Sequence, residues 1–488
     1  MRDLLSCIDS WSQRAPERVA HVSPSGRLSY GELGRGSAAV AALVQDALPD
    51  DRSPVVVIGH KEPEMLIAFL GSARAGHPYV PIDISIPSHR IREVIQTAGA
   101  RLTLTVETIR EALELARTPR PVSLAPSDPF YVMFTSGSTG EPKGVTITLG
   151  CLTSFVEWML AEHCFRLGGE VFLNQAPFSF DLSIMDTYLS LVTGGRLVSL
   201  TSDEIANPRQ LFEALRLSGV TTWVSTPSFA QLCVAEPTFG REMLPSLRRF
   251  LFCGETLPSH LAAQLVERFP ETAVWNTYGP TEATVATTSI RIDRTVLERY
   301  PVLPVGRPKP DSSVRIVDSE DQVVLHGQRG EIIIAGPNVS PGYLNRPDLS
   351  KRRFFKLDGV QAYRTGDRGH FEDDLLFFDG RVDSQVKLHG YRVELGDVEA
   401  NLRQVTGVCD AIVIPLERNH QIHALAAFVV GSHDLVPDDF ESAQRIRRAL
   451  AERLPSYMVP RVVRLVSSLP MTANGKVDRR KLAQEFTG

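Results

Sequence analysis

The sequence of 488 residues lacks any hydrophobic run that approaches the roughly 18 apolar residues of a membrane-spanning helix. Its first twenty residues are charged and lack the apolar core and small-residue cleavage site of a signal peptide. Neither sign of charge dominates, because 52 basic residues are interspersed with 57 acidic ones. These absences argue against membrane insertion and against a nucleic-acid surface, so a cytoplasmic protein is expected.

Cysteine is scarce and scattered. The six cysteines form no C-x-x-C pair and have no nearby histidine cluster at metal-ligand spacing, which disfavours a disulfide framework or a structural zinc. Lysine is scarcer still for a chain of this size, with eight against 44 arginines, so any lysine inside a motif gains interest. No internal repeat or low-complexity tract is visible, which excludes solenoid architectures.

What is present is an α/β pattern on a chain long enough for at least two domains. Short β-branched runs such as PVVVIGH (54–60) and GRLVSL (195–200) alternate with amphipathic, helix-like stretches such as EMLIAFLGSARAG (64–76) and NPRQLFEALRLSG (207–219). Between 300 and 380 the strands become closely spaced, which predicts an antiparallel or barrel-like portion. Residues 384–488 have a compact α+β pattern, with helices expected at 393–404 and 439–454, two strands between them and a polar tail after them. We therefore predict an N-terminal domain (1–382) and a smaller C-terminal domain (383–488), joined at a hinge at Asp383.

The first motif with chemical content is TSGSTGEPKG (135–144), which follows the strand-like run FYVMF. Its glycines let backbone N–H groups approach phosphate oxygens, its hydroxyls add donors, and Lys143 adds positive charge. It is not a Walker loop, because Pro142 and Gly144 occupy positions where that pattern needs Gly and Ser or Thr. A solvated turn is the alternative for such a cluster considered by itself.

Further motifs accompany it along the chain: NTYGPTEATV (276–285), GEIIIAGPNVSPGYL (330–344), YRTGD (363–367), GRVDSQVKLHGYRVEL (380–395) and MTANGKVDRRKL (471–482). Together they resemble the adenylate-forming superfamily, in family order over nearly the whole chain. The resemblance implies a large N-terminal domain of two α/β subdomains plus a distorted β-barrel, and a mobile α+β C-terminal domain on a hinge. It also implies ATP and Mg²⁺ as cofactors.

Such enzymes join a carboxylate to the α-phosphorus of ATP, so catalysis rests on positioning and on neutralising charge. The resemblance assigns Tyr278 to adenine, Asp367 to the ribose hydroxyls, Glu282 to Mg²⁺, and Lys476 to a catalytic bridge between the substrate carboxylate and the nucleotide. The full set of expected ATP-binding residues is Thr135, Ser136, Gly137, Ser138, Thr139, Gly140, Lys143, Asn276, Thr277, Tyr278, Gly279, Pro280, Thr281, Asp367, Phe378, Asp379, Gly380, Arg381 and Lys476.

The substrate is indicated by FSFDLS (178–183), where Asp181 occupies the position at which amino-acid-activating members bind the substrate ammonium. A carboxylate after an apolar run is costly to bury without a partner, which favours this role. A helix N-cap aspartate is the alternative. The expected pocket holds a small uncharged side chain and consists of Asp181, Leu182, Met185, Ser225, Leu251, Cys253 and Val285, with Lys476.

A closer resemblance, to the D-alanine:D-alanyl carrier protein ligases, is carried by stretches such as FLNQAPFSFDLSIMD (172–186) and FCGETLP (252–258). In that family the cysteine of the second stretch, here Cys253, lines the alanine pocket. Taken alone, a buried cysteine is more simply a small hydrophobic residue. An enzyme for L-alanine, serine, glycine or L-proline that loads a natural-product carrier stays open, as do an acyl-CoA synthetase, which Asp181 opposes, and an inactive scaffold protein.

The resemblance implies two steps: D-alanyl adenylate forms from D-alanine and MgATP, and a phosphopantetheine thiol then takes the acyl group. No carrier-protein serine motif occurs in the chain, so the carrier is expected to be a separate small acidic protein. A monomer is expected. The family's usual pathway is teichoic acid D-alanylation in low-GC bacteria, whereas the arginine bias points to a GC-rich genome and leaves the final acceptor open.

Overall fold

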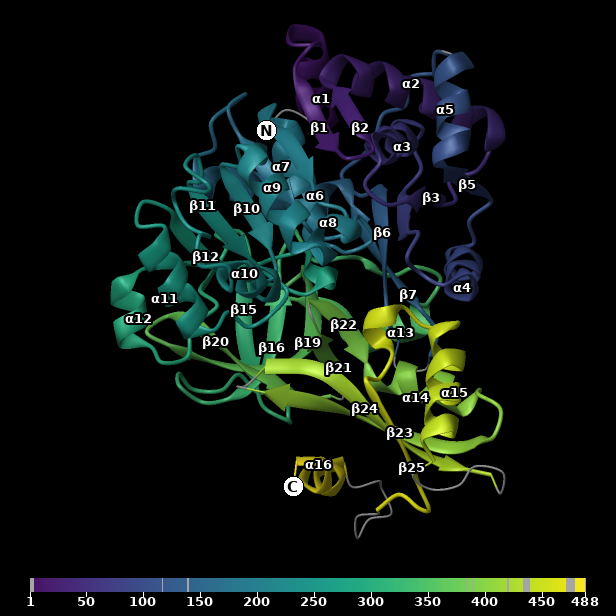
Figure 1. Ribbon diagram of the computed structural model, residues 1–488. Coiled ribbons are helices and arrows are strands. Elements are labelled where there is room, and N and C mark those ends of the chain that lie inside the picture. The colour runs from purple at the N-terminus through teal and green to yellow at the C-terminus, as the bar shows by residue number, and fades with distance from the viewer. Residues whose placement is uncertain are drawn as a thin grey trace. The chain divides into compact units, whose positions relative to one another are not determined.

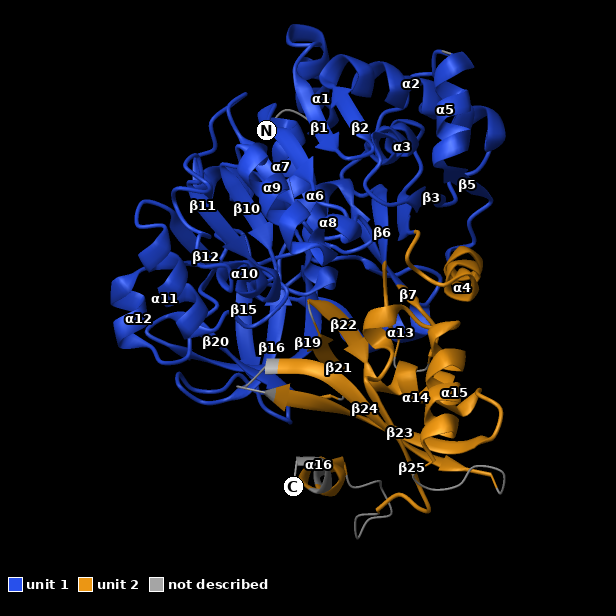
Figure 2. Cartoon of the chain, viewed as in Figure 1, with its two compact units in different colours: residues 1–83, 98–133, 144–382 blue, residues 84–97, 134–143, 383–488 orange. Residues whose placement is uncertain are grey.

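The computed structural model describes residues 4–115, 117–137, 140–383, 385–388, 390–418, 421–432, 439–470 and 479–487 (Figure 1). The chain divides into two compact units (Figure 2). Unit 1 comprises Met1–Asp83, Ala98–Met133 and Gly144–Val382, and unit 2 comprises Ile84–Thr97, Phe134–Lys143 and Asp383–Gly488. The long segment of unit 2 thus begins at Asp383, and two short segments from the expected N-terminal domain join it. The two-domain division and the hinge stay predictions.

A nine-stranded sheet forms one α/β part of unit 1, in the order β14-β13-β12-β11-β10-β8-β9-β1-β2. The neighbours from β12 to β1 are parallel, and β2, β13 and β14 pair antiparallel at the two edges. Parallel neighbours require crossover connections, which helices supply here. The strands are β1 (Val19–Ser23), β2 (Gly26–Ser29), β8 (Val171–Asn174), β9 (Arg196–Ser199), β10 (Thr222–Ser225), β11 (Arg249–Phe252), β12 (Ala273–Tyr278), β13 (Thr288–Ile292) and β14 (Arg307–Pro308). The helices are α7 (Leu182–Thr193), α8 (Ser202–Ala206), α9 (Pro208–Ser218), α10 (Pro227–Val234) and α11 (Ser259–Arg268).

A six-stranded sheet, in the order β17-β7-β6-β4-β3-β5, forms a second α/β part. The pairs β3–β4, β3–β5 and β4–β6 are parallel, as the alternating pattern of the sequence predicts. Its strands are β3 (Val55–Gly59), β4 (Tyr79–Asp83), β5 (Leu102–Thr105), β6 (Pro129–Thr135), β7 (Lys143–Thr148) and β17 (Gly342–Tyr343). The other helices of this part of the chain are α1 (Leu4–Arg14), α2 (Tyr30–Ala47), α3 (Pro63–Arg74), α4 (Ser88–Ala98), α5 (Val106–Leu115) and α6 (Leu149–His163).

The antiparallel portion expected between 300 and 380 is a five-stranded sheet in the order β15-β16-β19-β18, with β20 paired to β19. All of its pairs are antiparallel. The strands are β15 (Ser313–Val317), β16 (Gly330–Ala335), β18 (Phe354–Leu357), β19 (Val360–Glu372) and β20 (Leu375–Arg381). The short helices nearby are the 3₁₀ turn η1 (Thr281–Ala283), α12 (Arg294–Arg299) and α13 (Pro347–Arg353).

Local sequence explains where the crossover helices begin and end. The Asn207 side chain caps α9 by accepting from the backbone N–H groups of Arg209 and Gln210. Pro208 stands at the first helical position, where its missing N–H has no cost. Gly219 ends the helix in the left-handed region, with φ of 61°. These signals match the stretch NPRQLFEALRLSG that the sequence predicts as helical.

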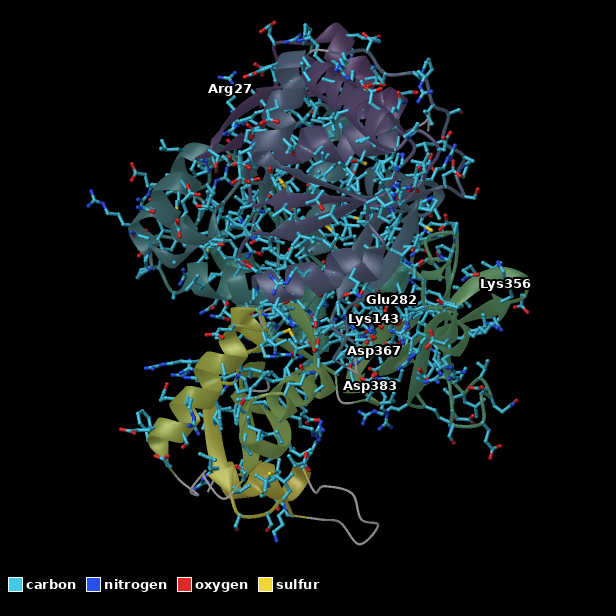
Figure 3. The ribbon with its side chains drawn as sticks, turned by 90° about the vertical axis from the view of Figure 1, so that its right-hand side faces the viewer. Arg27, Lys143, Glu282, Lys356, Asp367 and Asp383 are labelled. Carbon is cyan, nitrogen blue, oxygen red and sulfur yellow. The ribbon has the colours of Figure 1, made fainter. Side chains whose placement is uncertain are left out.

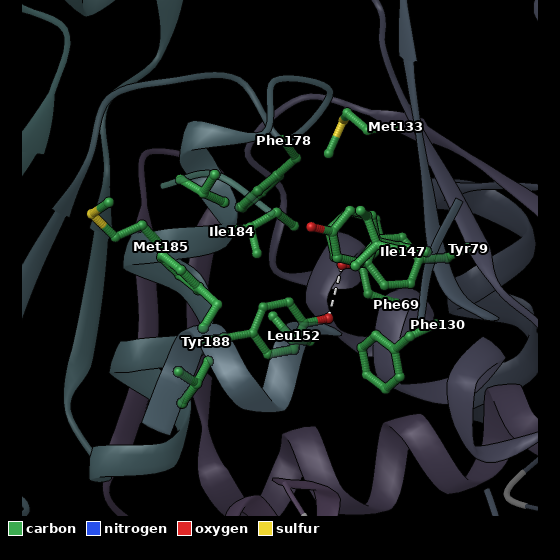
Figure 4. Close-up of a cluster of buried hydrophobic side chains, with 14 of the residues drawn as sticks. Phe69, Tyr79, Phe130, Met133, Ile147, Leu152, Phe178, Ile184, Met185 and Tyr188 are labelled. Carbon is green, nitrogen blue, oxygen red and sulfur yellow. Dashed lines mark hydrogen bonds between the residues drawn. The ribbon is translucent and has the colours of Figure 1, made fainter. Parts of the chain in front are cut away.

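An aromatic cluster packs inside unit 1 (Figure 4). The rings of Phe69 and Tyr79 stack at 4.4 Å, and the Phe130 ring meets Tyr188 edge-on at 5.7 Å. Burial leaves the two tyrosine hydroxyls without water, and they satisfy one another across 2.8 Å. Because Tyr188 belongs to α7, this core fixes the helix that follows Asp181.

Unit 2 contains a three-stranded sheet, β23-β24-β25, and a two-stranded one, β21-β22. The expected helices at 393–404 and 439–454 and the two expected strands between them are present, but residues 393–394 end strand β22 and the helix begins at Leu395. Residues 462–466 and 479–487, expected as a polar tail, form a strand and a helix. The elements are β21 (Gln385–Leu388), β22 (Tyr391–Glu394), α14 (Leu395–Arg403), β23 (Val408–Arg418), β24 (Gln421–Gly431), α15 (Phe440–Ala451), η2 (Ser456–Met458), β25 (Val462–Val466) and α16 (Arg479–Thr487).

Candidate active site

Tyr278 and Asp367, expected to bind adenine and ribose, meet inside unit 1. Tyr278 ends β12, Asp367 lies on β19, and the Tyr278 hydroxyl donates to Asp367 Oδ2 across 2.6 Å. Burial, followed by the charge of Asp367, raises the pKa of Tyr278 well above its ordinary value. The phenol therefore stays protonated and keeps its donor. Two segments 89 residues apart in sequence are joined by this bond.

The carboxylate of Asp367 also forms an ion pair with an arginine. In the β19–β20 ladder Asp367 stands opposite Arg381, whose guanidinium contacts Asp367 Oδ1 and donates to the Thr365 carbonyl at 3.3 Å. The Phe378 ring lies 6.1 Å from that of Tyr278, tilted by 39°. The structure thus brings Asp367 of YRTGD and Tyr278 of NTYGPTEATV together, with Arg381 bound to the carboxylate and the Phe378 ring near that of Tyr278. A carboxylate close to an aromatic ring is suited to bind a ribose and a base.

Glu282, the expected Mg²⁺ ligand, is fully buried within η1. The hydroxyl of Tyr343 donates to Glu282 Oε1 across 2.7 Å and so orients the carboxylate. Glu282 and Asp367 are labelled in Figure 3. Among the described residues, no group of three His, Cys, Asp or Glu side chains could hold a metal ion. A single carboxylate is compatible with Mg²⁺, which commonly binds one or two carboxylates together with substrate phosphates and waters.

Asp181 is the polar residue of the expected amino-acid pocket. It is 8% exposed and precedes α7, yet within the described part of the chain its side chain makes no capping hydrogen bond to that helix. Instead Asp181 Oδ2 accepts a hydrogen bond of 2.6 Å from the Thr281 hydroxyl. The Asp181 side chain therefore does not cap α7, which was the alternative interpretation of this residue. The contact joins the residue expected at the ammonium to one expected at the phosphates.

The other expected pocket residues come from α7, β10 and β11, from the residue after β11 and from the turn after η1. Cys253 is 3% exposed, and its thiol donates to the Val285 carbonyl at 3.5 Å. The Ser225 hydroxyl is satisfied by protein, since it accepts from Trp223 Nε1 at 2.7 Å and donates to the Thr226 carbonyl at 2.9 Å. All the expected apolar lining residues are buried: Leu182, Met185, Leu251, Cys253 and Val285.

Residues 135–143 of the expected phosphate loop belong to unit 2, where Ser136 is hydrogen-bonded to strand β22. The Ser136 hydroxyl donates to the Arg392 carbonyl at 2.8 Å and accepts from the Glu394 N–H at 3.0 Å. Lys143 Nζ lies 3.6 Å from Glu394 Oε1. Thus a hydroxyl and the ammonium of the loop both have protein partners in unit 2. Ser138, Thr139 and Lys476 lie outside the described residues.

A buried ion pair supports the same loop. Arg90 donates to Asp397 Oδ2 at 2.7 Å and to the Gly140 carbonyl at 2.8 Å. Gly140 has φ of 91°, and a Cβ there would lie 2.9 Å from that of Ala400, so glycine is required on both counts. Burial outweighs the attraction of Arg90 and raises the pKa of Asp397 from 3.8 to about 6.

This raised pKa predicts a pH-dependent stability. Between about pH 4 and 6 the folded state binds the Asp397 proton more tightly than the unfolded state, so its contribution to the free energy of unfolding falls as pH rises, by at most about 3 kcal/mol. Asp397→Asn is expected to flatten this part of the profile, measured by urea unfolding at pH 4.5 to 7.5. Asp410→Asn, which alters an exposed ion pair with Arg403, is the control. Parallel profiles for wild type and Asp397→Asn would contradict the assignment.

Sequence reasoning assigned no role to Tyr343 or Asn338, both of which contact the site. Both stand in GEIIIAGPNVSPGYL, so the motif marked the region without indicating the partners. The cleft of about 640 Å³ elsewhere in unit 1 is lined by Trp158, Trp275 and Arg291, among others, and by none of the expected site residues. We therefore do not assign the reaction to that cleft.

Comparisons with known proteins match nearly the whole chain. A family described as AMP-binding enzyme matches residues 8–344, and one described as AMP-binding enzyme C-terminal domain matches residues 397–476. The chain is 44% identical to the D-alanine–D-alanyl carrier protein ligase of Bacillus cereus (strain G9842) and 45% identical to that of Bacillus mycoides (strain KBAB4), with 99% of each chain covered in both cases.

Two solved structures share the fold. The Vibrio cholerae adenylation domain AlmE, in complex with glycyl-adenosine-5'-phosphate, has a TM-score of 0.85 at 22% identity, with 99% of this chain and 98% of that one covered. Holo-PA1221, with adenylation and PCP domains and a bound vinylsulfonamide inhibitor, has a TM-score of 0.81 at 26% identity, covering 99% and 84%. In the described part of this chain, no helix has the length and apolar character needed to span a membrane.

Proposed function

The chain belongs to the AMP-binding enzyme family and, within it, to that of the D-alanine–D-alanyl carrier protein ligases, and from this premise we propose that it activates D-alanine with ATP. The D-alanine carboxylate attacks the α-phosphorus and pyrophosphate leaves, giving D-alanyl adenylate. The phosphopantetheine thiolate of a separate carrier protein then attacks the acyl carbon, and AMP leaves. The resemblance, the pocket and the curated relatives support this reaction. We place it in the cytoplasm and expect a monomer.

On the nucleotide side, we propose that Asp367 accepts the two ribose hydroxyls while Tyr278 and Phe378 flank adenine. Arg381 keeps the carboxylate oriented and compensates its charge in a buried setting. Residues 135–143 contact the β- and γ-phosphates, with Lys143 exchanging Glu394 for a phosphate oxygen. The other nucleotide contacts proposed from the motifs are Asn276, Thr277, Gly279, Pro280, Thr281, Asp379 and Gly380.

Mg²⁺ fits the chemistry of Glu282. When bound, the ion would neutralise charge on the phosphates. What the chain supplies is a buried carboxylate whose orientation is fixed by Tyr343, with its backbone held by a hydrogen bond from Ser340 N–H to the Glu282 carbonyl at 2.8 Å. Lys476 is proposed to bring positive charge to the point where the substrate carboxylate attacks the α-phosphate. Asp383 is proposed to act as the hinge about which the C-terminal domain rotates, which removes Lys476 from the site before the second step.

On the amino-acid side, the observation that carries the proposal is the contact between Asp181 and Thr281. A buried carboxylate next to apolar lining residues has one strong charge to offer, which suits an α-ammonium. Its 2.6 Å bond to Thr281 places that charge beside a residue of the NTYGPTE motif, so amine and phosphate recognition are adjacent. Leu182, Met185 and Cys253 leave an apolar surface for a short side chain.

The test is ATP–pyrophosphate exchange with purified protein and a panel of D- and L-amino acids. D-Alanine is expected to give the strongest exchange. A partner protein carrying phosphopantetheine should then accumulate a D-alanyl thioester, measured by intact mass. A dominant signal from L-alanine, serine, glycine or L-proline would replace the substrate and keep the reaction. Exchange with no amino acid would overturn the proposal, and thioester formation on free coenzyme A would favour an acyl-CoA synthetase.

A further inference from the structure

The turn that follows Glu282 has an unusual backbone. Thr284 and Val285 have φ of 53° and 68°, the left-handed region that residues other than glycine rarely adopt. Both are β-branched, for which the conformation is especially unfavourable. Two successive strained residues persist only where surrounding contacts hold them. Both are buried, so water does not supply those contacts.

Asn338 supplies them. This residue, between β16 and β17, is fully buried, and its side-chain amide nitrogen donates to the Ala283 carbonyl and to the Thr287 hydroxyl, each at 2.8 Å. Its own backbone carbonyl accepts from the Thr284 hydroxyl at 2.7 Å. Three hydrogen bonds therefore bracket the strained pair on both sides. The amide orientation is fixed, because a carbonyl such as that of Ala283 can only accept.

The turn connects two parts of the proposed site. Glu282 precedes it, and the Val285 carbonyl accepts the hydrogen bond from the Cys253 thiol. Val285 and Cys253 are expected lining residues of the amino-acid pocket, so the backbone conformation at 284–285 decides where this wall of the pocket lies. A shift of a few tenths of an ångström there changes the space beside the substrate Cα.

We propose that Asn338 is a positioning residue for amino-acid selection, which holds the 283–287 turn in its left-handed conformation and thereby sets the Val285–Cys253 wall. The pocket role of that wall rests on the proposed function, whereas the hold on the turn does not. Asn338 does not touch the reacting atoms. The hydrogen bond between Tyr278 and Asp367 does not involve Asn338.

The test variant is Asn338→Asp, which keeps the size of the side chain. A carboxylate has no donor, and even a protonated acid retains at most one of the two donations. The matched control is Ser312→Ala. Ser312 donates to Asn338 Oδ1 at 2.9 Å, so the control alters the opposite end of the same amide and leaves both donations to the turn. Thr284→Gly is the rescue background, because glycine adopts a positive φ readily.

Amide hydrogen exchange of the peptide containing 283–287 and ATP–pyrophosphate exchange are measured for each protein. Asn338→Asp is expected to accelerate hydrogen exchange in this peptide and to raise the KM for D-alanine about tenfold or more, with the KM for ATP within about twofold. Ser312→Ala should stay within about twofold in both KM values. In the Thr284→Gly background, Asn338→Asp should raise the KM for D-alanine by a clearly smaller factor.

Unchanged hydrogen exchange in Asn338→Asp would overturn the inference. So would equal increases in both KM values with a lowered melting temperature and no rescue by Thr284→Gly, which would indicate a general folding role. If the wild-type protein exchanges pyrophosphate with no amino acid, the proposed function fails, while the hydrogen-exchange comparison still decides whether Asn338 holds the turn.

Discussion

Asp181→Asn is expected to lower kcat/KM for D-alanine by about 10²-fold or more in ATP–pyrophosphate exchange. The substitution keeps the shape of the side chain, and the amide oxygen can still accept from the Thr281 hydroxyl. What is lost is the negative charge that we propose binds the substrate ammonium. The KM for ATP should change by less than about threefold, because Tyr278 and Asp367 are untouched. Varying D-alanine and ATP separately measures both effects.

The matched control is Asp186→Asn, which alters a buried carboxylate on α7, the helix that follows Asp181. Asp186 accepts from Asn174 at 3.0 Å, and burial raises its pKa well above the ordinary value, so an amide resembles its neutral form. This variant should keep the wild-type KM for D-alanine. Equal losses in the two variants would indicate a general disturbance of α7, and an unaffected Asp181→Asn protein would remove the ammonium assignment.

Lys476→Ala is expected to reduce adenylate formation on the order of 10²–10³-fold, the usual effect of removing a group that stabilises transition-state charge. The physical reason is that the attacking carboxylate and the α-phosphate are both anions. Thioester formation from synthetic D-alanyl adenylate and a carrier protein should stay within about threefold of wild type, because the role proposed for the lysine is confined to the first step. Rapid-quench measurement of each half-reaction separates the two.

Lys481→Ala, which alters an exposed lysine on α16, is the control for this experiment, and both half-reactions should keep their wild-type rates. Lys476→Arg tests whether charge alone suffices, and a partial recovery is expected because the guanidinium is larger and planar. Equal losses in both half-reactions for Lys476→Ala would contradict the two-step assignment.

Local patterns predicted most of the fold. The runs that became β3, β6 and β9 and the amphipathic stretches that became α3 and α9 carry their own periodicity and end signals. The helix in the tail carries a weaker signal. Among the described side chains of α16, Leu482 is the buried hydrophobic residue that joins the cluster with Ile412 and Phe428, which is too little to mark a helical face. The grouping of 84–97 and 134–143 with unit 2 depends on contacts such as that of Arg90 with Asp397, over 300 residues away in sequence. A single pair of opposite charges cannot be recognised from the sequence, because the chain contains many other acidic and basic residues.

The candidate site shows the same division. The family resemblance singled out Tyr278, Asp367, Glu282 and Asp181 as candidate site residues, and the structure joins the first two directly. The sequence did not reveal that Tyr343 orients Glu282. A tyrosine hydroxyl can bond many partners, and the partner of Tyr343 depends on how β17 pairs with β7. The contribution of supporting residues emerges only from three-dimensional packing.

The place of β1 in the nine-stranded sheet bears on how the protein is made. β1 pairs in parallel with β9, so His21 and Val22 cannot pair with Leu197 and Val198 until the ribosome has synthesised those residues. At a synthesis rate of about 5–20 residues per second, the ribosome needs on the order of 10–35 s to add the intervening stretch. During this interval one edge of the nascent β1–β2 hairpin exposes unpaired backbone groups, and chaperone binding is expected to fall in that window.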